Sequence, residues 1–167
     1  MPQHLKPLAS ASPTYCQLHT TALAFIDAQA QTAEHPSRMN FEKIEALCTT
    51  EFQQSWGHNY AISLSPRLQG THSFSEFRKH LAMMLPSLES WETTVTEVIV
   101  DEAKRKVVLR ISFWMRVKGA EEMVENDLLW VLEMDDTGEK VKKSVEFVDG
   151  IAAGKIKEII LANGPRE

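Results

Sequence analysis

The chain lacks the features that mark several large classes of protein. Only two of its 167 residues are cysteines, Cys16 and Cys48, and they have neither a CxxC nor a zinc-type spacing. No stretch of about 18 apolar residues occurs, and the N-terminus has no basic region followed by an apolar run. We therefore expect free thiols, no membrane span, no secretory signal and a cytoplasmic location.

The short motifs of nucleotide, metal and nucleophile sites are also missing. There is no GxGxxG, P-loop, HExxH or GxSxG sequence. The net charge is −5, and the longest basic run, residues 140–143, is interrupted by Val141. Such a balance is not typical of nucleic-acid binding. No tight metal-ligand spacing connects five of the histidines, His19, His35, His58, His72 and His80. We expect no cofactor, no metal ion and no nucleic-acid or membrane partner.

Hydrophobic residues make up 43% of the chain, which is enough for one sizeable core. We expect a flexible N-terminal segment over residues 1–11 and a single domain over residues 12–167. Ser12 and Pro13 predict a helix start, with helical periodicity to about Glu34. Asn40 predicts the cap of a second, short helix. Residues 49–71 show no clear period, and a capping box at residues 73–76 starts a third helix.

After Pro86 the hydrophobic period changes from helical to two, which predicts strands. We expect strands over residues 93–101 and 106–117, then a hairpin with its turn at residues 135–138, then a closing helix that stops at Gly164. Helices followed by strands in meander order predict an α+β fold. The expected architecture is a cone-shaped, curved antiparallel sheet wrapped over three N-terminal helices, with a short C-terminal helix.

The second hairpin strand ends in an acid. By the two-residue period, Val141, Val145, Phe147 and Asp149 share one face. An apolar surrounding would raise the pKa of Asp149 and suit a general acid or base. The alternative is that Asp149 caps the following helix.

Three helices, an irregular loop and long strands that contain WVLEMDDTGEKV and VEFVDG resemble the SnoaL-like polyketide cyclase/isomerase family. This family belongs to the nuclear-transport-factor-two-like superfamily, and the two motifs resemble those of small fungal members tied to secondary metabolism. The resemblance covers roughly residues 12–161. It implies a deep apolar pocket, a dimer formed through the outer sheet face, no cofactor and acid/base catalysis. The family's pocket Asp falls on Asp149, whereas its frequent pocket His falls on Val117, which favours a different acid/base arrangement.

Two further residues are candidate catalytic groups. His58 lies in the loop expected to cover the mouth of the cone, and its side chain titrates near neutral pH. Arg38 lies in the break between the first two helices, where its donor fork could hold a substrate oxygen. An exposed loop histidine and a surface ion pair are the respective alternatives. If the inward parity of residues 123–134 is reversed, Glu133 becomes the pocket acid. The predicted substrate-binding residues are Trp56, Tyr60, Ile111, Phe113, Met115, Asn126, Trp130 and Phe147.

An exposed tryptophan between two arginines is typical of the centre of an interface. We therefore predict a homodimer through the outer face that carries Arg110, Ser112, Trp114 and Arg116. The predicted function is cofactor-independent isomerisation or cyclisation of a polycyclic polyketide, meroterpenoid or related secondary metabolite. A non-catalytic small-molecule-binding or dimerisation module on the same fold is the alternative.

Overall fold

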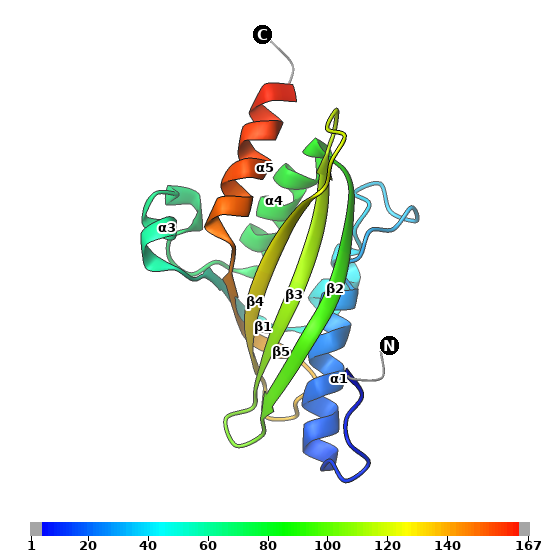
Figure 1. Cartoon of the computed structure of the whole chain (residues 1–167). Coiled ribbons are helices and arrows are strands. Elements are labelled where there is room, and N and C mark those ends of the chain that lie inside the picture. The colour runs from blue at the N-terminus through cyan, green and yellow to red at the C-terminus, as the bar shows by residue number, and fades with distance from the viewer. Residues whose placement is uncertain (1–4, 164–167) are drawn as a thin grey trace.

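The computed structural model describes residues 5–163 and consists of one curved sheet with helices packed around it (Figure 1). Of the N-terminal segment predicted to be flexible, residues 1–4 lie outside the described residues, while Leu5 is buried. The elements in chain order are α1 (Pro13–Asp27), α2 (Phe41–Ala46), β1 (Cys48–Trp56), α3 (Asn59–Ser63), η2 (Pro66–Leu68), α4 (Phe74–Met84), η3 (Leu85–Ser87), β2 (Leu88–Asp101), β3 (Lys106–Val117), β4 (Val124–Met134), β5 (Val141–Phe147) and α5 (Gly150–Asn163).

The predicted helix starts are confirmed by their capping hydrogen bonds. The Ser12 hydroxyl accepts from the backbone N–H of Tyr15, and Asn40 Oδ1 accepts from that of Lys43. Ser73 forms the expected capping box with Glu76. The first helix ends at Asp27 rather than near Glu34.

Residues that follow α1 are used instead to hold the start of β2. The Trp91 indole N–H donates to the Gln29 carbonyl oxygen at 2.9 Å, and the Trp91 backbone N–H donates to Gln31 Oε1 at 2.9 Å. These bonds satisfy polar groups outside the helix, which is why the helical period of the sequence overstates its length.

The sheet has the strand order β1-β5-β4-β3-β2. Strands β2 to β5 form the predicted antiparallel meander, and the hairpin of β4 and β5 is central as expected. Gly138 in its turn has φ +76°, the left-handed conformation that favours glycine. Strand β1 was not predicted, because residues 49–71 were expected to be irregular. It adds to the sheet in parallel to β5.

A register shift in β5 decides which of its side chains face inward. Glu133 pairs with Lys143 and Met134 pairs with Val141, so Lys142 is an extra residue on β5. A bulge of this kind inverts the alternation of faces beyond it. Val141 and Ser144 are therefore both fully buried.

The core lies between the sheet and the helices. Trp130 of β4, Phe25 of α1 and Phe77 of α4 meet there, with ring centroids 5.5 Å apart for Phe25–Trp130 and 6.4 Å apart for Phe77–Trp130. In Figure 1, α4 and α1 lie behind the strands, α5 runs along the upper part of the sheet, and α3 projects to the side. No helix among residues 5–163 is both long and apolar enough to cross a membrane.

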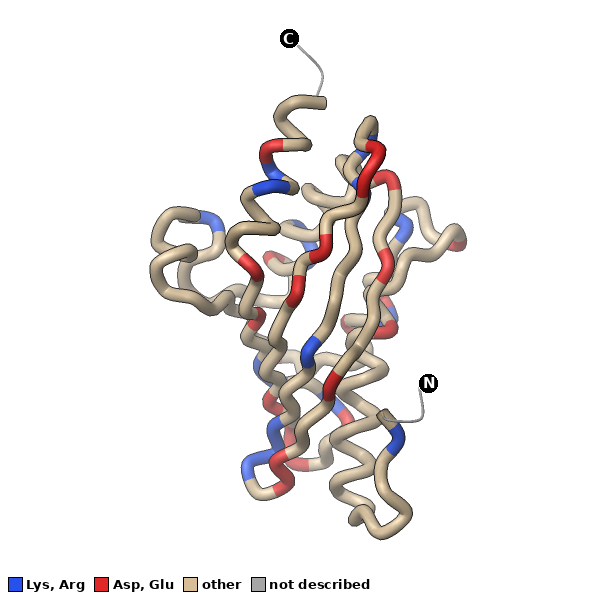
Figure 2. Tube along the Cα trace, viewed as in Figure 1, with Lys and Arg blue, Asp and Glu red and all other residues tan. Residues whose placement is uncertain are grey.

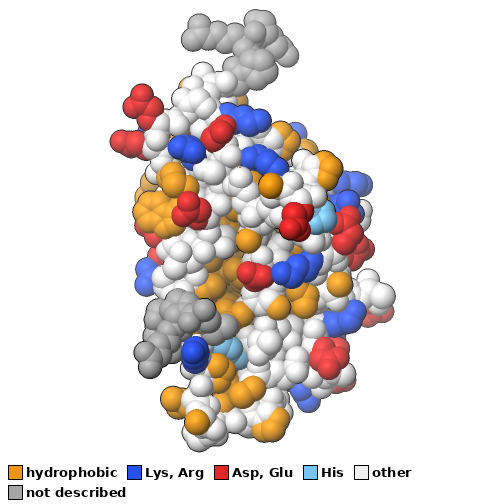
Figure 3. All heavy atoms as spheres, turned by 90° about the vertical axis from the view of Figure 1, so that its right-hand side faces the viewer, with side chains coloured by type: hydrophobic (Ala, Val, Ile, Leu, Met, Phe, Trp, Pro, Cys, Tyr) orange, Lys and Arg blue, Asp and Glu red, His pale blue; other side chains and the backbone are white. Residues whose placement is uncertain are grey.

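Charged residues of both signs are distributed over the whole molecule. Figure 2 shows basic and acidic positions interspersed along strands and helices. In the side view of Figure 3, acidic, basic and hydrophobic side chains alternate over the visible face. This distribution offers no broad basic surface on that face.

Candidate functional site

Glu146 lies on the inner face of β5, between two tryptophans. Its Cα partner on β1 is Trp56, and its Cα partner on β4 is Trp130. Because side chains directly opposite on neighbouring strands lie about 5 Å apart at Cβ, the three form one row across the sheet. The Trp56 indole N–H donates to Glu146 Oε2 at 2.9 Å.

The helix α4 closes this row from the other side. The Trp56 ring has His80 of α4 at 5.0 Å and His72 at 5.2 Å, measured between ring centroids. His72 Nε2 lies 3.0 Å from the Gln69 carbonyl oxygen. The indole that binds Glu146 thus packs against two imidazoles.

Burial makes Glu146 a weaker acid than an ordinary glutamate. Its carboxyl is surrounded by protein, and this burial raises its pKa to about 7, although the Trp56 hydrogen bond opposes the rise. The residue nevertheless remains partly exposed to solvent. Burial also lowers the pKa of His80, with smaller contributions from the charges of His72 and Arg67. The site therefore contains a carboxyl that both gains and loses a proton near neutral pH.

Asp149 and Phe147 were predicted to face inward, and this placement is wrong. The bulge at Lys142 reverses which side chains of β5 face inward beyond it. Phe147 faces outward and pairs with Leu129 of β4. Asp149 is exposed and caps α5, since its Oδ1 accepts from the backbone N–H of Ile151 at 2.8 Å and of Ala152 at 3.2 Å.

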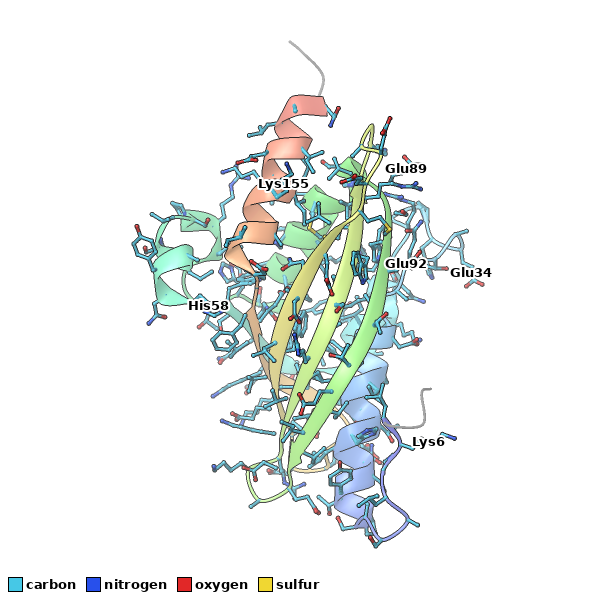
Figure 4. The ribbon with its side chains drawn as sticks, viewed as in Figure 1. Lys6, Glu34, His58, Glu89, Glu92 and Lys155 are labelled. Atoms are coloured by element: carbon cyan, nitrogen blue, oxygen red, sulfur yellow. The ribbon has the colours of Figure 1, made fainter. Side chains whose placement is uncertain are left out.

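His58 and Asp149 nevertheless line one groove on the outer face. The groove encloses about 420 Å³ and is formed by His58, Arg110, Asp127, Leu129, Phe147, Val148 and Asp149. His58 is exposed, has φ +61° and approaches the Phe147 ring edge-on at 5.3 Å. Figure 4 shows it beside α3. Glu146 does not line this groove.

Arg38 is bound to backbone rather than directed at either site. Its guanidinium donates to the carbonyl oxygens of Leu85, Leu88 and Glu89 at 2.7 to 2.9 Å and lies 5.2 Å from the Trp91 ring centroid. Glu89 and His58 are on opposite sides of the molecule in Figure 4. The predicted place of Arg38 at the mouth of the cone is therefore corrected to a clamp between η3 and the start of β2.

The other predicted substrate-binding residues fall into two groups. Tyr60 is 79% exposed on α3, so it is not part of an inner wall. Asn126 is buried, and its Oδ1 accepts from the backbone N–H of Asp149 at 3.1 Å. Four residues are buried on the sheet, as their predicted parity requires: Ile111, Phe113, Met115 and Trp130. Trp56 is also buried, but at the end of strand β1 rather than in the predicted loop.

The residues of β4 predicted to face inward are buried: Asn126, Leu128, Trp130 and Leu132. Glu133 is therefore not the pocket acid. Glu133 pairs instead with Lys106 at 3.5 Å and Lys143 at 4.0 Å. On the outer face Arg110 binds Asp127 through both carboxylate oxygens, and Ser112 donates to Glu125 at 2.6 Å. Within residues 5–163 no group of three or more His, Cys, Asp or Glu side chains is placed to hold a metal ion.

Glu146 was not among the predicted site residues, because unbroken alternation along β5 places it on the outer face. One signal was available: Lys142 and Lys143 are adjacent, and a bulge lets two neighbouring lysines both face water in a half-buried strand. Recognising that bulge would have placed Glu146 inside and Asp149 outside.

No model of a known protein family matches this sequence, and no curated protein matches it. Solved structures do share its fold. PrhC from Penicillium brasilianum aligns with TM-score 0.71 at 18% identity, over 89% of this chain and 91% of that one. BvnE pinacolase from Penicillium brevicompactum gives the same TM-score and identity, over 89% and 97%.

A structure described as a SnoaL-like polyketide cyclase, from Jannaschia sp. CCS1, aligns with TM-score 0.68 at 15% identity, over 89% of this chain and 96% of that one. These likenesses define the fold class. The protein has the α+β fold of SnoaL-like and nuclear-transport-factor-two-like proteins, in which a curved, unclosed sheet packs against helices.

Proposed function

We propose that this protein is a cofactor-independent isomerase or cyclase that transfers a proton through Glu146. Its substrate would be a polycyclic polyketide, a meroterpenoid or a related secondary metabolite. The observation that carries the proposal is the Glu146 carboxyl on the inner face of β5, which accepts from the Trp56 indole N–H and whose pKa is raised by burial to about 7. A group with this pKa is half protonated near neutral pH, which is the condition for efficient acid/base catalysis.

The shared fold supports this proposal. One similar structure is a pinacolase, and another is described as a polyketide cyclase. One fold can host unrelated functions, so the reaction must be argued from the site. Here the aromatic surroundings of Glu146 favour a flat, largely apolar substrate.

The test is proton exchange. The protein is incubated in D₂O with a panel of polycyclic ketones, and deuterium uptake at the carbon next to the carbonyl is followed by NMR. Glu146→Gln should lower the exchange rate by about 10²–10⁴-fold, the usual contribution of a positioned acid or base. Asp149→Asn, which preserves the helix cap, is the matched control and should change it less than threefold or so.

Exchange by the wild type should rise with pH through about 7, because the base form of Glu146 is the carboxylate. Full exchange by Glu146→Gln, or its loss in Asp149→Asn, would move the chemistry to the outer groove and reject the assignment.

We also propose that the protein is a homodimer through the outer sheet face. Trp114 of β3 is 39% exposed and Ile99 of the neighbouring strand β2 is 54% exposed, both on the outer face of the sheet. Trp114→Glu should convert a dimer into a monomer in analytical ultracentrifugation, whereas Glu158→Lys on α5 should not. A monomeric wild type at micromolar concentration would exclude this interface.

The cytoplasmic location stays a prediction. Both thiols are free, and burial raises the pKa of Cys48 to about 12, which keeps it unreactive. Free thiols are usual in a reducing compartment.

A further inference from the structure

The indole of Trp56 packs against α4 and the residue that leads into it. Its ring centroid lies 5.0 Å from that of His80, 5.2 Å from that of His72 and 6.5 Å from that of Phe77. Because residues three apart share one face of a helix, Phe77 and His80 present a continuous surface to the indole. The position of the indole therefore depends on α4 as well as on β1.

Trp56 lies at the end of its own strand. It is the last residue of β1, and Gly57, which follows it, has no side chain to pack against the ring. The indole is nevertheless directed at Glu146, with 2.9 Å between Nε1 and Oε2. A side chain keeps a hydrogen bond in one geometry where packing restricts its rotamers. For Trp56 this packing comes from α4.

The N-terminal end of α4 is itself fixed to β1. Gln54 and His72 exchange two backbone hydrogen bonds of 2.8 Å, two residues before Trp56. The His72 ring is fixed as well, because its Nε2 lies 3.0 Å from the Gln69 carbonyl oxygen. A carbonyl oxygen only accepts, so this nitrogen donates. The helix thus meets the indole at a defined position.

His80 is half-buried, and this affects its charge. Burial lowers its pKa, and the charges of His72 and of Arg67 on η2 lower it further, so the neutral imidazole is the form present at pH 7. A neutral ring packs against the indole without placing a positive charge near Glu146. Such a charge would favour the carboxylate and lower the pKa of Glu146.

We infer that His80 is a positioning residue, which holds the Trp56 indole N–H against the Glu146 carboxyl group. It acts through Trp56 and not by touching a substrate. The inference rests on the proposed function for its place in proton transfer, and it adds a residue that controls the protonation of the acid. The hydrogen bond from Trp56 opposes the rise in the pKa of Glu146, so weakening this bond raises that pKa further.

The test follows the titration of Glu146 by ¹³C NMR of its carboxyl group, with no ligand added. Its resonance is the one that is absent in Glu146→Gln, and the wild-type midpoint should lie near pH 7. His80→Ala should raise the midpoint by roughly one pH unit, because a hydrogen bond to a charged group is weakened. His80→Phe keeps an aromatic ring beside the indole and should restore the wild-type midpoint.

Met83 provides the matched control, because it is 57% exposed on the same helix. Met83→Ala should leave the Glu146 midpoint unchanged. Protein labelled with ¹⁵N in its indole rings then reports the hydrogen bond directly. The resonance that is absent in Trp56→Phe should move upfield in His80→Ala. The resonance of Trp114 on the outer face should stay in place, which shows that the variant is folded.

Two results would overturn the assignment of His80. One is an unchanged Glu146 midpoint in folded His80→Ala. The other is a midpoint in His80→Phe that is raised as much as in His80→Ala, since the aromatic contact would then not be what positions the indole.

These outcomes are separate from that of the proposed function. If His80→Ala raises the midpoint while Glu146→Gln still exchanges deuterium at the wild-type rate, the role of His80 stands and the proposed reaction falls. If Glu146→Gln loses exchange while His80→Ala leaves the midpoint unchanged, the reverse holds.

Discussion

Glu146 and Asp149 are three residues apart in the chain, yet they occupy opposite environments. Glu146 is embedded between Trp56 and Trp130, where burial raises its pKa to about 7. Asp149 is exposed and is used to cap α5. The comparison shows that the chemistry of a carboxylate depends on the face of the strand that carries it more than on its place in a motif.

The largest effect on stability should come from the inner acid. The folded-state pKa of Glu146, about 7, lies above its ordinary value of 4.5. The folded protein therefore keeps a proton that the unfolded chain has lost between these pH values, so stability falls as pH rises from 4.5 to 7. The loss is up to about 3 kcal/mol. Glu146→Gln should abolish it, as measured by urea unfolding at pH 5 and pH 8. An unchanged pH dependence would show that Glu146 ionises normally.

A second effect should come from the clamp that lies far from both acids. Arg38→Ala removes three hydrogen bonds to backbone carbonyls and the contact with Trp91. We expect a loss of about 2–3 kcal/mol in the free energy of unfolding. Proton exchange by the folded fraction should be unchanged. A folded variant that loses exchange would return Arg38 to the catalytic site.

Gly57 lies between Trp56, which binds Glu146, and His58, which lines the outer groove. Its substitution should have a smaller effect on stability. A Cβ at this position would lie 2.0 Å from Phe147 Cδ1, which is impossible without movement of the ring. Gly57→Ala should cost about 1–3 kcal/mol in stability. The double variant with Phe147→Ala should be less destabilised than the sum of the single variants. Additive losses would show that the ring is not the obstacle.

The smallest effect on stability should come from substitution of Asp149, the exposed acid. Asp149→Ala removes the cap of α5 and should cost about 1 kcal/mol, whereas Asp149→Asn should be nearly neutral because asparagine caps helices equally well. Thermal unfolding distinguishes the two variants. Equal losses in both would mean that the charge of Asp149, and not its capping oxygen, stabilises the helix.

Much of the architecture could be predicted from local patterns. Features that depend only on neighbouring residues are all confirmed. They are the helix caps at Ser12, Asn40 and Ser73, the turn glycine Gly138 and the alternation in residues 106–117. The fold class followed from the order of these elements.

The candidate site could not be predicted in the same way, because it depends on contacts between distant residues. Strand β1 was missed since its inward positions include the polar Gln54, which blurs the apolar alternation. Glu146 was missed since its register depends on one extra residue. Arg38 was misplaced because three carbonyl groups some 50 residues away compete for its donors.

The bulge at Lys142 has a consequence for relatives of this chain. The number of residues in β5, and not only their identity, decides which of its side chains face the interior. Deleting Lys142 would remove the bulge and leave Glu146 inside, whereas deleting one residue beyond the bulge, such as Val145, would exchange Phe147 for Glu146 at the inner wall without a single substitution. A change of one residue in the length of β5 therefore removes an acid from the inner face or places one there. A sequence alignment that ignores such gaps would assign the inner acid to the wrong position.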